Sequence, residues 1–366
     1  MDRKYWFWIN NIKGIGNIKV RRILKAFGDD PEAVYEAGKE GLKMSAGETG
    51  ITANDCDLIS DKNKAGIIFK EYEEYNCRGG MKFVVPSDMN YPQRLKELYD
   101  RPNILYYKGR LPREEAKAVA VIGSRNCSEY GRSIASELGR RLGAAGASVI
   151  SGLALGIDGE AHRGAVMGGG RTYGVLAGGV DICYPAGNFN LYMDMQKDGG
   201  IISEFPAGTP TRAGMFPLRN RIISGLSDAV VVVEAGCKSG TLITVAQALE
   251  QNRHVYAVPG RLGDPDSAGC NRLISEGAQI ITDIDALMEE LGLGCGSAPE
   301  NKKNNLLLAT DEKMLYSQLL DFNPKSLDTL TGECGLPPER IFSALVELEL
   351  KGLIRETAKN FYMRIR

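Results

Sequence analysis

The sequence lacks the cysteine and histidine patterns that a zinc cluster or a disulfide framework needs. Its eight cysteines are scattered singly without C-x-x-C spacing, and only two histidines, His162 and His254, accompany them. Both kinds of site depend on ligands or thiols at closely matched spacings. We therefore expect no metal site and reduced, mostly structural cysteines.

Long apolar runs and an excess of either charge are also missing. No stretch approaches the roughly 20 apolar residues of a membrane-spanning helix, and the first residues contain no signal-peptide core. A cytoplasmic protein without membrane contact is therefore expected. The formal net charge is −1, so the chain as a whole gives no electrostatic sign of a polyanionic partner. Any nucleic-acid site must be local.

The length and composition allow one large core with smaller flanking domains. The chain has 366 residues, 43% of them hydrophobic and 25% charged. In residues 1–80 the apolar residues follow helical spacing on both sides of a K-G-I-G turn at 13–16. This pattern is typical of a helix-hairpin-helix, SAM-like domain, whose turn can hold a DNA phosphate on backbone amides. A turn that merely needs glycine is the favoured interpretation.

Residues 81–292 have the pattern of an extended Rossmann-like α/β domain with a doubly wound parallel sheet. Short β-branched runs alternate with amphipathic helices, and each run is followed by a loop that contains glycine. In such a sheet the ligand lies beyond the carboxyl ends of the strands. The predicted strands are 119–122, 148–150, 173–176, 200–202, 229–233 and 254–258.

The last part of the chain predicts a linker at 293–306 and a winged-helix domain at 307–366. The linker is polar and rich in glycine, and three helices and an extended piece follow it. The third helix would be the recognition helix, but Glu339, Glu347 and Glu349 make it a poor surface for phosphates. A protein-contact or auxiliary role is favoured over the reading of DNA bases.

Two loops after predicted strands combine glycine with a basic side chain. The first is Gly123-Ser124-Arg125, and the second contains Lys238 followed by S-G-T. Glycine lets the backbone approach a ligand, the following helix offers unpaired N–H donors, and Arg125 can bind two oxygens of one phosphate. For the first loop, phosphate binding is favoured over the alternative, a loop whose Gly and Ser only close a strand–helix turn, and the second loop offers a second phosphate cradle with a point charge.

Dinucleotide-dependent redox enzymes and P-loop nucleotide hydrolases are disfavoured because their motifs are absent. There is no G-x-G-x-x-G, no ribose-binding acid after the second strand, and no P-loop order around Lys238. Asp158 is expected to cap the helix that follows it. His162 is expected to pack in the core, since no second catalytic group stands near it.

Residues 119–260 hold nearly equal numbers of basic and acidic side chains, but Arg125, Arg219, Arg221 and Lys238 fall in segments that this topology can bring to one sheet edge. One basic cleft on a neutral domain suits single-stranded DNA, which is bound by charge and by base stacking on aromatic rings. For each candidate ring taken alone, core packing is the favoured interpretation. The candidate rings are Tyr130, Tyr184, Phe189 and Phe216.

These motifs together resemble the DprA (Smf) family of DNA-processing proteins. The matching segments run in order from about residue 88 to 260: Y-P-Q-R-L at 91–95, R-P-N-I-L-Y-Y-K-G at 101–109, V-A-V-I-G-S-R at 119–125, S-G-L-A-L-G-I-D-G-E-A-H at 151–162, L-A-G-G-V-D at 176–181, F-P-L-R-N-R-I-I-S-G-L-S at 216–227 and E-A-G-C-K-S-G-T at 234–241. The resemblance implies a homodimer without catalytic residues or cofactor. Such a protein binds and protects single-stranded DNA and helps to load the RecA recombinase during natural transformation.

The resemblance also nominates the residues of the DNA site. In the family the arginine of the G-S-R loop and the lysine of the K-S-G-T loop contact DNA phosphates, and the F-P-L-R-N-R segment contributes. The implied DNA-binding residues are Gly123, Ser124, Arg125, Arg219, Asn220, Arg221, Lys238, Ser239, Gly240 and Thr241.

The alternative function is that of a nucleotide phosphoribohydrolase of the lysine-decarboxylase-like family, which uses the motif P-G-G-x-G-T-x-x-E. Aligning Gly240 and Thr241 with this motif puts Thr244 where the catalytic glutamate belongs. The general acid/base is then missing, so a non-enzymatic DNA-binding protein is favoured.

Overall fold

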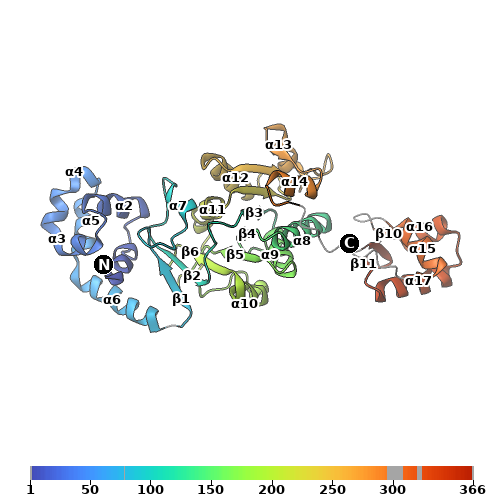
Figure 1. The fold of residues 1–366 in the computed structure, drawn as a ribbon, viewed down its shortest axis with the longest axis horizontal. Coiled ribbons are helices and arrows are strands. Elements are labelled where there is room, and N and C mark those ends of the chain that lie inside the picture. Colours follow the sequence, from blue (N-terminus) through green and yellow to red (C-terminus); the bar gives the residue numbers. More distant parts are fainter. Residues whose placement is uncertain (1, 78, 295–307, 320–323, 365–366) are drawn as a thin grey trace. The chain divides into compact units, whose positions relative to one another are not determined.

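The computed structural model describes residues 2–77, 79–294, 308–319 and 324–364 (Figure 1). The chain divides into two compact units, Met1–Gly296 and Ser297–Arg366. The predicted linker, apart from Leu293 and Gly294, lies outside the described residues. Among the helices of the described segments, none is long and apolar enough to cross a membrane.

Residues 2–77 are helical, as the apolar spacing predicted, and form six helices. The K-G-I-G turn joins the first two of them, and Gly14 adopts a φ of +96°, which favours glycine. The buried face of the first helix, including Trp6 and Trp8, shares one apolar cluster with Phe83 and Tyr106 of the sheet. The helices are α1 (Arg3–Asn10), α2 (Asn17–Ala26), α3 (Pro31–Met44), α4 (Ala46–Thr49), α5 (Ala53–Ser60) and α6 (Lys62–Cys77).

A nine-stranded sheet in the order β1-β2-β6-β5-β4-β3-β7-β8-β9 forms the centre of the first unit. From β6 to β9 the strands are parallel, as predicted, whereas β2 pairs antiparallel with β6, and β1 antiparallel with β2. The two antiparallel strands and β9 were not predicted. The strands are β1 (Met81–Val84), β2 (Leu105–Gly109), β3 (Ala118–Ile122), β4 (Ser148–Ser151), β5 (Arg171–Val175), β6 (Gly200–Ser203), β7 (Ala229–Val232), β8 (His254–Ala257) and β9 (Gln279–Ile280).

Helices cover both faces of this sheet, which makes it doubly wound. In β3, Val119 and Val121 pack into the cluster of α8, α9 and α14, while Ala120 and Ile122 pack into the cluster of α11, α12 and α13. This alternation follows the two-residue period of a strand. The helices are α7 (Gln93–Lys96), α8 (Glu129–Ala144), α9 (Ile157–Met167), α10 (Phe189–Asp198), α11 (Met215–Gly225), α12 (Thr241–Glu250), α13 (Ala268–Ser275) and α14 (Ile284–Glu290).

In its described residues, 308–319 and 324–364, the second unit contains three helices and then a β-hairpin, the order predicted for a winged helix. Leu330, Ile341, Leu345 and Leu348 lie at the centre of its apolar cluster. The strands form a sheet in the order β10-β12-β11. The elements are α15 (Thr310–Gln318), β10 (Lys325–Ser326), α16 (Leu327–Cys334), α17 (Pro338–Leu350), β11 (Ile354–Ala358) and β12 (Phe361–Arg364).

Candidate nucleic-acid interface

The loops that follow β3 and β7 leave the same edge of the sheet. The two strands pair in parallel with Ile122 opposite Val232, and just beyond them the backbone N–H of Ser124 donates to the carbonyl of Glu234 at 2.8 Å. Arg125 follows in the first loop and Lys238 in the second, and both side chains are exposed. The topology thus places the two cations on neighbouring loops.

Glycines in the loops after β3 and β4 let neighbouring loops pack closely against one another. A Cβ atom at Gly123 would lie 2.9 Å from the carbonyl oxygen of Glu234, and one at Gly156 would lie 2.3 Å from that of Ser124. The sequence suggested that Gly123 lets a ligand approach the backbone. In the structure the missing Cβ of Gly123 lets the β7 loop approach, and a ligand contact at this glycine stays a prediction.

The N-terminus of α8 is already occupied by a carboxylate of the protein. Glu234 is buried and accepts hydrogen bonds from the backbone N–H of Ser128, at 2.9 Å, and from the Ser128 hydroxyl. The same hydroxyl accepts from the backbone N–H of Gly131 at 3.1 Å, so Ser128 caps α8, which begins at Glu129. The expectation of unpaired donors for a phosphate is therefore wrong for Ser128 and Gly131.

The loop of Lys238 is braced by its own hydroxyl groups. Ser239 donates from its hydroxyl to that of Thr241 at 3.0 Å and accepts from the backbone N–H of Thr241 at 3.2 Å. A Cβ atom at Gly240 would have no heavy atom within 4 Å, so the turn faces open space. Lys238 is therefore presented on a short, internally supported turn.

An aromatic surface adjoins Arg125. The Arg125 guanidinium carbon lies 4.7 Å from the centre of the Phe216 ring, and the Tyr184 ring centre lies 6.3 Å from that of Phe216. Tyr184 is 51% exposed and Phe189 54% exposed, so the core-packing interpretation is wrong for these two rings. Tyr130 is half-buried and donates to the carbonyl of Pro259 at 3.3 Å. The exposed Tyr184 and the half-buried Phe216 beside Arg125 form a surface on which bases can stack.

Arg219 points into the protein. Its side chain is buried and donates to the carbonyl oxygens of Gly152, at 2.7 Å, and Val175, and Nε donates to the Asn220 side chain at 3.0 Å. Burial lowers the pKa of Arg219 to about 10, and the charge of Asp158 opposes that shift. Arg219 therefore fastens α11 to the ends of β4 and β5.

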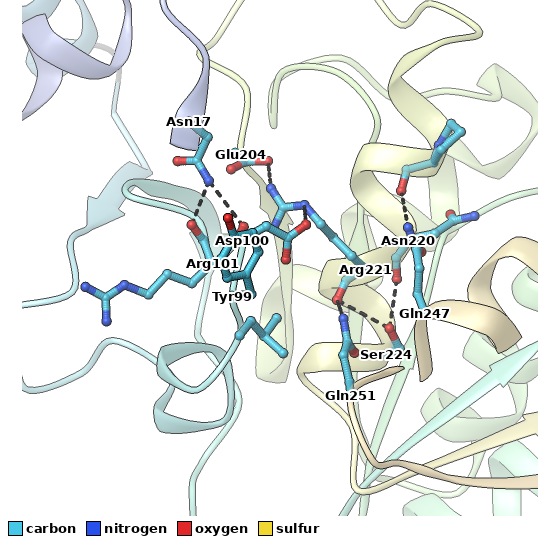
Figure 2. Close-up of polar contacts among 12 residues, drawn as sticks. Asn17, Tyr99, Asp100, Arg101, Glu204, Asn220, Arg221, Ser224, Gln247 and Gln251 are labelled. Atoms are coloured by element: carbon cyan, nitrogen blue, oxygen red, sulfur yellow. Dashed lines mark hydrogen bonds and ion pairs between the residues drawn. The ribbon is translucent and has the colours of Figure 1, made fainter. Parts of the chain in front are cut away.

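Arg221 is also buried and paired inside the protein (Figure 2). It donates to the Glu204 carboxylate, and its Nε lies 3.2 Å from Oδ2 of Asp100. Its carbonyl oxygen accepts from Nε2 of Gln251 at 3.0 Å. Both arginines of the F-P-L-R-N-R segment, Arg219 and Arg221, thus bind groups inside the protein. Phe216 is the residue of this segment that contacts Arg125.

Asp158 does not cap α9, in contrast to the prediction. Gly156, at a φ of +73°, occupies the N-cap position, so Asp158 falls inside the first turn. There its Oδ2 accepts from the backbone N–H of Gly152 at 3.0 Å. Burial raises the pKa of Asp158, while Arg219 and the Gly152 amide lower it.

His162 packs in the core, as predicted. It is fully buried, and Nδ1 lies 2.5 Å from the Thr172 hydroxyl. Burial lowers the pKa of His162 to about 3. Across the described segments, no group of three or more histidine, cysteine or acidic side chains is placed to hold a metal ion.

Comparison with known families agrees with this architecture. The sequence model of DNA recombination-mediator protein A matches residues 82–292, and that of the DprA winged helix domain matches residues 301–358. The chain belongs to the DprA family. The predicted resemblance and the predicted fold class are thereby confirmed.

Individual DprA proteins match over most of their length. The DNA processing protein DprA of Bacillus subtilis is 42% identical over 245 residues, which cover 64% of this chain and 82% of that protein. The X-ray structure of DprA from Streptococcus pneumoniae superposes with a TM-score of 0.64 at 31% identity, covering 78% of this chain and 97% of that one. A Helicobacter pylori DprA structure, described for its single-stranded DNA binding mode, gives a TM-score of 0.52 at 29% identity, covering 58% and 95%.

Proposed function

We propose that this DprA protein binds single-stranded DNA in the cytoplasm at the carboxyl edge of its sheet and helps to load RecA on it during natural transformation. The observation that carries the proposal is the adjacency of the Arg125 and Lys238 loops beside an aromatic surface. The names of the Bacillus and Streptococcus relatives, and the DNA-binding mode described for the Helicobacter protein, support it.

In the proposed complex, the side chains of Arg125 and Lys238 bind phosphates, and bases stack on Phe216 and Tyr184. Charge and stacking together bind a flexible strand with little dependence on sequence. Rigid duplex DNA hides its base faces, so it gains only the charge contribution. The other residues of the proposed site shape the two loops or hold α11 in place: Gly123, Ser124, Arg219, Asn220, Arg221, Ser239, Gly240 and Thr241.

A binding protein fits this site better than a phosphoribohydrolase does. The position of the catalytic glutamate of that family corresponds to Thr244, which is 3% exposed. A buried threonine cannot take or deliver a proton in the way a carboxylate does. RecA loading and a homodimer are proposed from family membership. The same holds for a division of the first unit into a helical domain at 1–80 and a DNA-binding domain at 81–292.

Fluorescence anisotropy tests the binding proposal. Labelled oligo-dT and a duplex of equal length are titrated with the full-length protein, and nucleoside monophosphates are incubated with it and assayed for hydrolysis. We expect tighter binding of oligo-dT and no hydrolysis. Equal affinity for both DNA forms, or turnover of a nucleotide, would contradict the proposal. RecA loading is tested by whether the protein shortens the lag of RecA assembly on a strand coated with single-strand-binding protein.

A further inference from the structure

The amino edge of the sheet, where its parallel strands begin, carries three arginines that the proposed DNA site does not use. Arg171 is the first residue of β5, Arg110 directly follows the antiparallel strand β2, and Arg113 lies in the loop that leads from β2 to β3. In the sheet order β2-β6-β5-β4-β3, this loop has to pass the starts of β6, β5 and β4. The topology therefore brings these residues, the amino-edge arginines, to one side of the sheet.

The amino-edge arginines gather around Tyr173, the third residue of β5. Arg171 and Tyr173 are two residues apart on one strand, so their side chains lie on the same face of the sheet. The backbone N–H of Arg110 donates to the carbonyl of Gly199 at 2.9 Å, and the next residue, Gly200, pairs with Tyr173. Burial raises the pKa of Tyr173, while the charges of Arg171, Arg113 and Arg110 lower it. All three cations therefore lie close to one buried side chain.

Contacts with α7 fix the loop that carries Arg113. Arg94 of α7 donates from Nη2 to the carbonyl oxygens of Ala116, at 3.0 Å, and Glu114, at 3.4 Å. The Glu114 carboxylate accepts from the backbone N–H of Gln93 at 2.8 Å and lies 3.7 Å from Nη1 of Arg94. The acidic side chain that directly follows Arg113 in the chain is therefore engaged with α7.

Little negative charge compensates the amino-edge arginines. Among the described residues, no carboxylate forms an ion pair with Arg113 or Arg171, and Glu115 in the same loop is exposed. Arg110 lies 4.0 Å from Asp198, but the two side chains are 57% and 76% exposed, so this pair contributes little. Arg110 and Arg113 are exposed and Arg171 is half-buried. Three like charges side by side favour the binding of an anion.

We propose that the amino-edge arginines bind phosphates of single-stranded DNA, as a second contact on the edge of the sheet opposite Arg125 and Lys238. The inference rests on the proposed function and extends it. Guanidinium groups suit this ligand, because each can bind two oxygens of one phosphate. The buried Tyr173 offers no face to a base, so the contact is with the backbone of the strand.

The two edges are too far apart for a short oligonucleotide to engage both. From Arg171 to Val175, β5 alone spans about 13 Å, and the strand has to pass around the sheet and its covering helices. A short strand therefore occupies the carboxyl edge, where charge and stacking act together. A long strand can engage the amino edge as well.

The test compares strands of two lengths. Oligo-dT of about 6 and of about 40 nucleotides, below and above the usual extent of one single-strand site, is titrated by anisotropy at several salt concentrations. The full-length proteins are the wild type, Arg113→Ala, Arg113→Lys and the double variant Arg110→Ala/Arg113→Ala. Both arginines are exposed, so their replacement leaves the core intact. Lys70→Ala is the matched control, because it removes an exposed cation from α6.

The effect is expected for the long strand only. Arg113→Ala should lower the slope of its log affinity against log salt concentration by about 0.7, and the double variant by about 1.4. The affinity for the long strand should fall severalfold, while the short strand should bind as it does to the wild type. Arg113→Lys should keep the wild-type slope because the charge remains, and Lys70→Ala should change neither strand.

A long-strand slope that the double variant leaves unchanged overturns the second contact. Equal losses for both strand lengths overturn it too, because the arginines would then belong to the site at the carboxyl edge. Calorimetric titration with inorganic phosphate separates the two sources of the anion. Phosphate binding that the double variant abolishes, with an unchanged long-strand slope, would assign the arginines to a free phosphate and contradict the proposal. Failure of the wild-type protein to bind either strand would instead refute the proposed function.

Discussion

The guanidinium carbon of Arg125 lies 4.7 Å from the centre of the Phe216 ring. This contact joins the loop after β3 to α11, two segments about 90 residues apart in the chain. It holds an exposed cation beside a ring that can itself accept a base. The charge and the stacking surface of the proposed site are therefore coupled through one pair of side chains.

Replacing Phe216 should weaken DNA binding through this coupling. We expect Phe216→Leu to lower the affinity for oligo-dT by roughly 0.5–2 kcal/mol, the range of a cation–π contact, and Phe216→Tyr to retain most of it. In a double-mutant cycle with Arg125→Ala, measured by anisotropy, the two losses should not add. Strictly additive losses would show that the ring and the cation act independently.

Arg219 should matter more for stability than for DNA contact. Arg219→Ala leaves the carbonyls of Gly152 and Val175 without their donor and Asp158 without its nearby cation. We expect a loss of about 3–5 kcal/mol in the free energy of unfolding, measured in urea, because a buried charge loses its counterpart. Arg125→Ala is the control and should change that free energy by less than about 0.5 kcal/mol. A stable Arg219→Ala protein with no DNA binding would instead make Arg219 a direct DNA ligand.

Because His162 is buried, the free energy of unfolding should decrease in mild acid. The pKa of His162 is about 3 in the folded protein, against 6.5 for an unperturbed histidine, so the unfolded chain binds the proton more readily between these values. Stability therefore falls as the pH drops below about 6.5. From pH 7 to 5 we expect a loss of about 2 kcal/mol from this residue.

Urea unfolding of the wild-type protein and of His162→Gln at both pH values isolates this contribution. The variant should be less stable at pH 7 because it disturbs a packed site, but its stability should depend less on pH. If both proteins lose the same free energy on acidification, His162 is not the residue that titrates.

The winged helix should contribute little to strand binding. On α17 the acidic Glu339, Glu347 and Glu349 are exposed together with the apolar Phe342 and Val346. Such a surface repels phosphates. Removing residues 297–366 should therefore leave the affinity for oligo-dT nearly unchanged in anisotropy titrations. A large loss of affinity would contradict the auxiliary role and show that this unit binds DNA.

Six of the seven parallel strands and the loops after them were predictable because their residues obey a local rule. A β-branched run followed by glycine and a helix is recognised without knowledge of the rest of the chain. The strands β1, β2 and β9 were not predicted. The first two are antiparallel edge strands and β9 has only two residues, Gln279 and Ile280, both exposed, so no apolar pattern marks it.

The candidate site was only partly predictable, because the sequence shows which side chains are charged but not whether they point to the solvent or into the protein. Arg125 and Arg219 look alike in the sequence, yet one is exposed and the other is buried against carbonyl groups. Glu234 gave no sign that it would fill the N-terminus of α8 from a position more than 100 residues away. The predicted cap, Asp158, lies two residues after the observed N-cap, because Gly156 with its positive φ lets the helix begin at Ile157.

The salt dependence of single-stranded DNA binding tests the central claim most directly. Each phosphate contact contributes about 0.7 to the slope of log affinity against log salt concentration for a single strand. Arg125→Ala and Lys238→Ala are compared with the wild-type protein and with Lys70→Ala, which removes an exposed cation on α6, away from the site. The account predicts weaker binding and a slope lower by about 0.7 in each of the first two variants, with no change in Lys70→Ala. Wild-type slopes in both Arg125→Ala and Lys238→Ala would contradict it.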